Sequence, residues 1–229
     1  MISKKRVAIL ISGRGSNMAA LIKAAQNDET YPAHIALVIS NRPNAAGLEF
    51  ANQADIPTAI ISHKDFTTRK DFDNALERTL IAHEIDIVCS AGFMRLFTED
   101  FANKWKNRLL NIHPSLLPAF KGLDVHERVL DAGVKISGCT VHFVSAEMDS
   151  GPIISQAAVP VLQTDTPETL ADRILKTEHI IYPEALRLVA SEQVKLEGKC
   201  VFTKETEIQI ELMNDTETLI SPVPRKTSF

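Results

Sequence analysis

Two polar residues separated by one position could carry acid–base chemistry. Asn111 and His113 lie before a turn bounded by Pro114 and Pro118. Residues two apart in an extended chain project to the same side, so both side chains would face one ligand. An Asn amide can donate to a developing oxyanion, and a His exchanges protons near neutral pH. The pair favours a catalytic function, although a histidine in a loop is often only a hydrogen-bonded surface residue.

A carboxylate further along the chain could join this pair. Asp149 stands in Met-Asp-Ser-Gly-Pro, between two predicted strands. These residue types also form turns for local reasons, and the spacing by itself favours a plain turn. Two other features of the sequence also have simple explanations. His142 is interpreted as a packed or hydrogen-bonded strand residue, and residues 91–96 either line an apolar pocket or belong to the core.

A glycine-containing loop, Ser-Gly-Arg-Gly-Ser-Asn at residues 12–17, follows the first predicted strand. Glycines there let backbone N–H groups point at an anion bound at a helix N-terminus, so the loop predicts a monophosphate site. The alternative is a tight turn without a ligand. A dinucleotide fingerprint is excluded because Met18 occupies the third glycine position, and no Gly-Lys-Ser/Thr follows for a P-loop.

These segments must be positioned by a sheet whose strands alternate with helices. Short apolar runs separated by helical patterns predict an α/β fold with an open, mostly parallel, Rossmann-like sheet covered by helices on both faces. The predicted strands are residues 7–12, 35–40, 58–62, 85–91, 109–112, 137–144 and 153–161.

Helices are predicted between these strands. Apolar residues recur at helical spacing in two stretches: Met18, Leu21, Ile22 and Ala25, and Phe72, Leu76 and Leu80. Ser16 or Asn17 could cap the first helix. The last helix should begin at Thr166-Pro167 and kink or end near Pro183.

Composition bounds the class of protein. The 229 residues are 45% hydrophobic, which fits one domain over residues 1–229, with its core at about 6–190. The net charge of −4 gives no basic footprint for nucleic acid. The three cysteines are widely spaced, which suits a reducing cytoplasm and disfavours a zinc ribbon. No apolar run is long enough for a membrane span. Residues 191–229 should contain a small hairpin, with a mobile polar tail from residue 214.

Together the motifs resemble the folate-dependent phosphoribosylglycinamide formyltransferases of purine synthesis. The resemblance extends over residues 6–190, with segments in family order: ISGRGSN, VISNR, DIVCSAGFMRLF, LLNIHPSLLPAFKGL, GCTVHFVSAEMDSGPII and TEHIIYPEAL. NIHPSLLP with a downstream DxGPI is specific for the formyltransferase superfamily, and the early GxGSN loop narrows it to this branch.

The resemblance implies the site residues and the reaction. The amine of a glycinamide ribotide would attack the formyl carbon of 10-formyltetrahydrofolate directly, through a tetrahedral intermediate, without a metal or a covalent enzyme intermediate. Asn111 and His113 would stabilise the oxyanion, with Asp149 favouring the imidazolium. His113 or a water would carry the proton to the folate nitrogen. The residues expected to bind the ribotide are Gly15, Ser16, Asn17 and Glu178, and those expected to bind the folate are Arg69, Met94, Arg95, Leu96, Phe97 and Asn111.

Some features depart from the family or stay open. Asp124 stands where several relatives carry His, and nothing is transferred beyond residue 191. Three alternatives are a methionyl-tRNA formyltransferase, a 10-formyltetrahydrofolate hydrolase, and a non-catalytic nucleotide- or folate-binding module. The first two usually need an additional domain for which the chain has no evident room. A monomer or homodimer with small-molecule substrates is expected, without nucleic acid or membrane partners.

Overall fold

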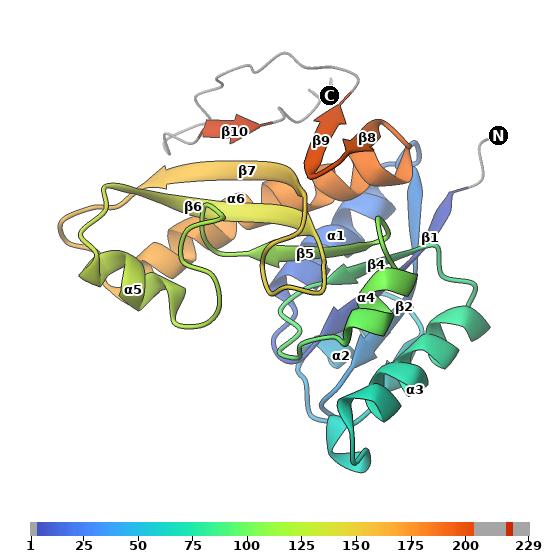
Figure 1. The fold of residues 1–229 in the computed structure, drawn as a ribbon. Helices are drawn as coiled ribbons and strands as arrows, with labels where there is room; N and C mark the ends of the chain where they lie inside the picture. The colour runs from blue at the N-terminus through green and yellow to red at the C-terminus, as the bar shows by residue number, and fades with distance from the viewer. Residues whose placement is uncertain (1–3, 204–218, 222–229) are drawn as a thin grey trace.

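The computed structural model describes residues 4–203 and 219–221, and within them the predicted strands form one sheet (Figure 1). Its strand order is β10-β7-β6-β5-β4-β1-β2-β3. The strands are β1 (Lys5–Ile11), β2 (Ala33–Ser40), β3 (Thr58–Ile60), β4 (Ile87–Ser90), β5 (Leu109–His113), β6 (Ile136–Phe143), β7 (Ile153–Pro160) and β10 (Leu219–Ser221). All seven predicted strands are present.

The sheet changes character at β5. Neighbouring strands from β3 to β5 run parallel, whereas β5–β6, β6–β7 and β7–β10 pair antiparallel. The expected open and mostly parallel arrangement is confirmed, and a purely parallel sheet is not formed. Antiparallel pairing places residues on β5 and β6 directly opposite one another, so the register of this pair affects which side chains meet.

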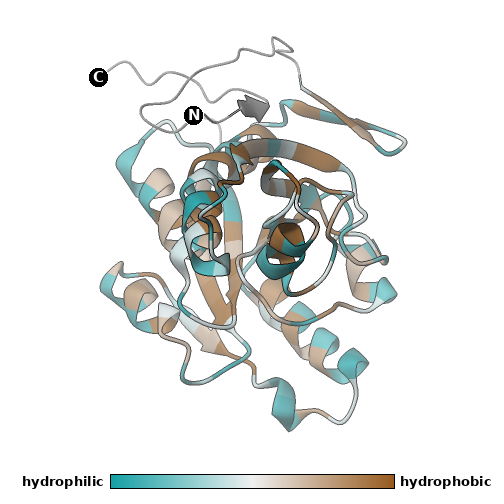
Figure 2. Cartoon of the chain, turned by 90° about the vertical axis from the view of Figure 1, so that its left-hand side faces the viewer, coloured by the Kyte–Doolittle hydropathy of each residue, from teal (hydrophilic) through white to brown (hydrophobic). Residues whose placement is uncertain are grey.

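Helices cover both faces of the sheet. They are α1 (Ser16–Asn27), α2 (Gly47–Gln53), α3 (Arg69–Ala82), α4 (Glu99–Lys104), α5 (Val125–Asp131) and α6 (Pro167–Ala190), with a 3₁₀ turn at His63–Asp65. One apolar cluster joins the sheet to α1, α2, α5 and α6, and a second joins it to α3 and α4. In Figure 2 the central strands are largely hydrophobic, and the helices around them carry both hydrophobic and hydrophilic residues.

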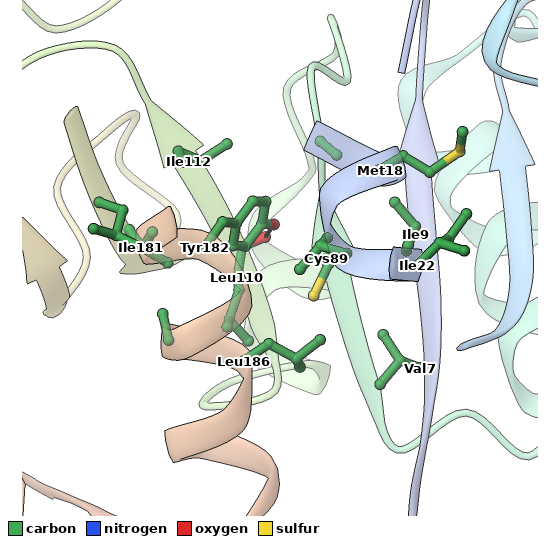
Figure 3. Packing of buried hydrophobic residues seen from close by; sticks show 14 of the residues in the cluster. Val7, Ile9, Met18, Ile22, Cys89, Leu110, Ile112, Ile181, Tyr182 and Leu186 are labelled. Atoms are coloured by element: carbon green, nitrogen blue, oxygen red, sulfur yellow. Dashed lines mark hydrogen bonds between the residues drawn. The ribbon is translucent and has the colours of Figure 1, made fainter. Parts of the chain in front are cut away.

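The longest helix, α6, anchors one face of the core. Tyr182 is fully buried, and its hydroxyl donates to the carbonyls of Ser90 (3.0 Å) and Leu110 (3.3 Å) on β4 and β5. Figure 3 shows Ile181, Tyr182 and Leu186 beside this part of the sheet, with Met18 and Ile22 of α1 nearby. The helix begins at the predicted position and continues through Pro183 to Ala190. The prediction that it could end at the proline is wrong, because burial of the flanking turns outweighs the lost hydrogen bond.

The C-terminal prediction is tested only in part. The expected hairpin is formed by β8 (Val194–Glu197) and β9 (Cys200–Thr203). Within the predicted mobile tail, Leu219–Ser221 form β10 and pair with β7. The other tail residues, 214–218 and 222–229, lie outside the described residues. Among the helices of the described chain, none has the length and apolar character required to cross a bilayer.

Candidate active site

A cleft of about 1140 Å³ opens at the carboxyl ends of β1, β4 and β5. Its lining comes from helices on both faces of the sheet, including Asn17 of α1, Glu178 of α6 and Arg69 of α3. In open α/β sheets, ligands bind at this edge because several loops and helix N-termini converge there. The cleft therefore lies where proteins with this kind of sheet bind their ligands.

The structure brings nearly all of these residues together. Those that line the cleft are Ser16, Asn17, Arg69, Met94, Arg95, Leu96, Phe97, Asn111, His113, Asp149 and Glu178. Gly15 is not part of the lining and directly precedes α1. The positions span more than 160 residues of sequence, so the cleft is assembled by the fold rather than by any one segment.

His113 and Asp149 form a buried pair. His113 is the last residue of β5, and Asp149 lies in the turn between β6 and β7. Their Nδ1 and Oδ2 atoms are 3.4 Å apart, and the side chains are only 7% and 11% exposed. Gly151 allows this turn to approach β6, because a Cβ there would collide with the backbone oxygen of Phe143. Asp149 thus lines the cleft beside His113, in addition to its place in the turn.

A second loop holds both members of the pair. His113 Nε2 lies 3.0 Å from the carbonyl oxygen of Phe120, and the Gly122 N–H donates to Asp149 Oδ2 at 2.9 Å. A carbonyl oxygen can only accept, so Nε2 carries a hydrogen. Nδ1 faces a carboxylate, which is also an acceptor. Both ring nitrogens of His113 therefore lie beside acceptor oxygens, one from the backbone and one from a carboxylate.

Asn111 is held by a residue on the neighbouring strand. It lies opposite His142 in the β5–β6 register, and its Nδ2 is 3.2 Å from His142 Nε2. The Nδ1 of His142 donates to the carbonyl of Phe143 at 2.9 Å. Burial lowers the pKa of His142, which favours the neutral ring with Nε2 as an acceptor for the amide. His142 therefore orients Asn111 within the cleft.

Another polar pair joins α1 to α6. Asn17 Nδ2 donates to Glu178 Oε2 at 2.7 Å, and both side chains are buried. Burial raises the pKa of Glu178 to about 7, and the Asn17 hydrogen bond only partly opposes this effect. The Oδ1 of Asn17 has no hydrogen-bond partner among the described residues. The pair can accept hydrogen bonds from a polar ligand that enters the cleft.

The beginning of α1 differs from the sequence prediction. Gly15 occupies the N-cap position with φ 76°, and no side chain caps the helix. The expected cap by Ser16 or Asn17 is wrong, because Asn17 is inside the helix and its amide bonds to Glu178 instead. The first N–H groups of α1 therefore have no side-chain cap, which is the arrangement that accommodates an anion.

The loop after β4 supplies apolar and cationic side chains. Met94 and Leu96 line the cleft although they are 61% and 50% exposed, and Arg95 lies between them. Ser12 ties this loop to its neighbours by accepting from the Met94 N–H (2.8 Å) and donating to Asn41 Oδ1 (2.7 Å). Of the two interpretations of residues 91–96, the structure favours a pocket wall for 92–96, with Ala91 and Phe93 also buried in the core.

Sequence reasoning missed the function of several neighbours. His142 was correctly expected to be hydrogen-bonded, and its contact with Asn111 follows only from the β5–β6 register. The backbone groups of Phe120 and Gly122 have no signature in the sequence. In the described part of the chain, no group of three or more His, Cys, Asp or Glu side chains could hold a metal ion.

The fold and the cleft define a three-layer α/β protein with a ligand site at the carboxyl edge of its sheet. Comparison with known proteins identifies the family, since the formyl transferase profile matches residues 5–186. The chain belongs to the formyl transferase family.

The chain is also similar to individual proteins of this family. The chain is 53% identical over 193 residues to the trifunctional purine biosynthetic protein adenosine-3 of Bos taurus, covering 84% of this chain and 19% of that protein. It spans between 14% and 20% of the length of the trifunctional relatives from cattle, human, chicken and insects. It is 37% identical to the phosphoribosylglycinamide formyltransferase of Haemophilus influenzae, covering 86% of this chain and 93% of that one.

A solved structure supports the fold. The glycinamide ribonucleotide transformylase 1 of Symbiobacterium toebii superposes with a TM-score of 0.86 at 46% identity, covering 88% of this chain and 95% of that chain. The expected formyltransferase fold is confirmed.

Proposed function

We propose that this protein transfers the formyl group of 10-formyltetrahydrofolate to the amine of 5-phosphoribosylglycinamide, as a one-carbon transferase of purine biosynthesis. The observation that carries the proposal is the convergence of Asn111, His113 and Asp149 in one cleft beside the N-terminus of α1. The activities named for the bacterial and trifunctional relatives support it.

The cleft fits both substrates. The uncapped N-terminus of α1 suits the single phosphate of the ribotide, and the backbone around Gly15 allows it to approach. Asn17 and Glu178 offer acceptors to the glycinamide amine and amide. The apolar side chains of Met94 and Leu96 suit a flat folate ring, with Arg69 and Arg95 available for a folate carboxylate.

In the reaction, the amine nitrogen forms a bond to the formyl carbon, and the bond from that carbon to the folate nitrogen breaks. Asn111 would donate to the developing oxyanion, and the positive charge of His113 would stabilise it. Asp149 would keep His113 charged. Both ring nitrogens of His113 already face acceptors, so we assign the transfer of the amine proton to the folate nitrogen to a water molecule.

The test is an acceptor series with the purified chain. Loss of the folate formyl group is followed with glycinamide ribotide, glycinamide riboside, methionyl-tRNA and no acceptor. We expect rapid transfer to the ribotide alone, because the phosphate and the positioned amine are both required. Equal use of the riboside would contradict the phosphate site. Formylation of methionyl-tRNA, or fast hydrolysis without acceptor, would assign the chain to a different activity, and ribotide binding without transfer would indicate a binding module.

The remaining expectations stay predictions. They are a cytoplasmic location, a single domain, a monomeric or homodimeric state, and the absence of nucleic-acid and membrane partners.

A further inference from the structure

The loop that holds the His113–Asp149 pair has an unusual backbone. Phe120, Gly122 and Asp124 have φ values of 52°, 85° and 54°, all in the left-handed region. Glycine and aspartate adopt this region readily, whereas the bulky side chain of Phe120 disfavours it. Such a backbone persists only where surrounding contacts impose it. The contacts that impose it therefore also determine where the Phe120 carbonyl and the Gly122 N–H are placed.

Arg128 of α5 makes contacts of this kind. Its Nη1 donates to the carbonyl of Lys121 at 2.6 Å and to that of Leu123 at 3.2 Å. The guanidinium carbon lies 5.8 Å from the centroid of the Phe120 ring. Arg128 is exposed and does not line the cleft, so it contacts the loop from outside the substrate site.

One peptide group links Arg128 to Asp149. The Lys121 carbonyl, which accepts from Arg128, and the Gly122 N–H, which donates to Asp149, belong to the same planar peptide. A cation on the oxygen side and a carboxylate on the hydrogen side both align with its dipole. Hydrogen bonds in such a chain polarise one another. The hydrogen bond from Arg128 to the Lys121 carbonyl therefore strengthens the one that the Gly122 N–H donates to Asp149.

We infer that Arg128 is a positioning residue for formyl transfer, which fixes His113 and Asp149 through the backbone of residues 120–123. The inference rests on the proposed function of the cleft. Arg128 does not contact the substrates. It holds the loop whose Phe120 carbonyl accepts from His113 and whose Gly122 N–H donates to Asp149.

Other contacts limit the size of its effect. Lys121 Nζ donates to Ser150 Oγ and lies 3.5 Å from Glu147 Oε1, which also ties the loop to the Asp149 turn. Ser115 Oγ donates to the carbonyl of Ala119 at 2.6 Å. Removing Arg128 should therefore loosen the pair while the fold is retained.

The central variant is Arg128→Met, which keeps an apolar stem over Phe120 and removes the donors. Arg108→Met is a matched control, because Arg108 also donates to a backbone carbonyl (Lys104, 3.0 Å) and stacks on a ring (Trp105, 4.6 Å) away from the cleft. We expect Arg128→Met to lower kcat roughly 10-fold, with KM for both substrates changed by less than about twofold. Arg128→Lys should restore part of kcat, and Arg108→Met should leave it unchanged.

A double-mutant cycle separates positioning from general destabilisation. In an Asp149→Asn background, Arg128→Met should cost less than about threefold in kcat, because the group on which it acts is already impaired. Full additivity of the two effects would overturn the inference. An equal loss of kcat in Arg108→Met would overturn it as well.

A readout without substrates keeps the inference independent of the proposed function. In ¹⁵N-histidine-labelled protein, the ring nitrogen signals of His113, assigned through His113→Asn, should shift in Arg128→Met and stay in place in Arg108→Met. Unchanged signals in Arg128→Met would refute the positioning function. A wild-type chain that transfers no formyl group would instead refute the proposed function. The spectra would still show whether Arg128 positions the His113 ring.

Discussion

The parallel and antiparallel halves of the sheet contribute different kinds of group to the cleft. The parallel half contributes the uncapped N-terminus of α1 after β1 and the loop of residues 92–97 after β4. The antiparallel half contributes the side chains of His142 and Asp149, each held by hydrogen bonds. Asn111 and His113 lie on β5, where the two halves meet.

The difference suggests a division of work. Backbone groups at the end of a parallel strand form a binding surface through short local connections. Side chains that must be placed against a reacting atom need contacts from several directions, and antiparallel strands provide them as direct cross-strand neighbours. The parallel half would then mainly bind the substrates, and the antiparallel half would mainly position the side chains that act on the reacting atoms. Variants in the parallel half should therefore mainly change KM, and variants in the antiparallel half should mainly change kcat.

The largest effect is expected at the junction. His113→Asn should lower kcat by roughly 10²–10⁴, because it removes the charge that stabilises the oxyanion. The KM values should change little, since the binding groups belong to the other half. Steady-state kinetics with both substrates, alongside circular dichroism, provide the measurement. Turnover close to wild type would remove His113 from the mechanism.

A smaller effect, of a different kind, is expected in the parallel half. Gly15→Ala should lower kcat/KM for the ribotide roughly 10- to 100-fold, mainly through KM. The added Cβ would lie 3.0 Å from Met18 Cε and 3.1 Å from Gly47 Cα, in a backbone conformation with φ 76°. The α1 N-terminus would then be displaced from the phosphate.

Gly133→Ala is the matched control for this variant. Gly133 also has a positive φ of 63°, has no atom within 4 Å of an added Cβ, and does not line the cleft. Gly133→Ala should introduce a similar backbone strain, and it should leave KM and kcat unchanged. A loss of kcat alone in Gly15→Ala would break the proposed division between the halves.

His142 tests the antiparallel half. His142→Leu removes the acceptor that orients Asn111, and we expect kcat to fall roughly 10-fold because the amide no longer has a fixed direction. His83→Leu, at the C-cap of α3 and away from the cleft, is the control. If KM for the ribotide rises while kcat is preserved, His142 belongs to binding rather than to chemistry.

The last prediction concerns stability rather than turnover, at the buried pair that joins α1 to α6. The pKa of Glu178 is about 7, above its usual value of 4.5, so the stabilising effect of its neutral form is present below pH 4.5 and lost as the pH rises through 7. As the pH rises from 5 to 8, wild type should lose this stabilisation and Glu178→Gln should not. The free energy of unfolding of the variant should therefore increase relative to that of wild type by roughly 1–3 kcal/mol over this range.

Urea unfolding of both proteins at the two pH values measures this difference. Glu77→Gln, which alters a carboxylate 2.7 Å from Lys104 and outside the cleft, is the control. Parallel pH dependence of the Glu178→Gln variant and wild type would show that Glu178 is not the titrating group.

The fold could be predicted to a large extent because its signals are local. Apolar runs and helical spacing placed all seven strands and the stripes of α1 and α3, since burial on a sheet or helix face imposes its period on the residues. The last helix was expected to kink or end near Pro183, and it does not end there, because a helix packed along its length tolerates one lost hydrogen bond. The cap at Ser16 or Asn17 was wrong because Asn17 has a stronger partner, 161 residues away.

The sequence by itself determined which chemistry is available. It placed Asn111 and His113 on one side of an extended strand, a glycine loop before a helix, and Asp149 in a tight turn, because each depends on a few adjacent residues. Only the tertiary structure decided which groups meet. Whether His142 faces Asn111 depends on the β5–β6 register, and the backbone groups of Phe120 and Gly122 bond to His113 and Asp149 only once residues 120–124 are folded against both. Hydrogen bonds have short range, so their partners follow from distances in space that no local pattern in the chain specifies.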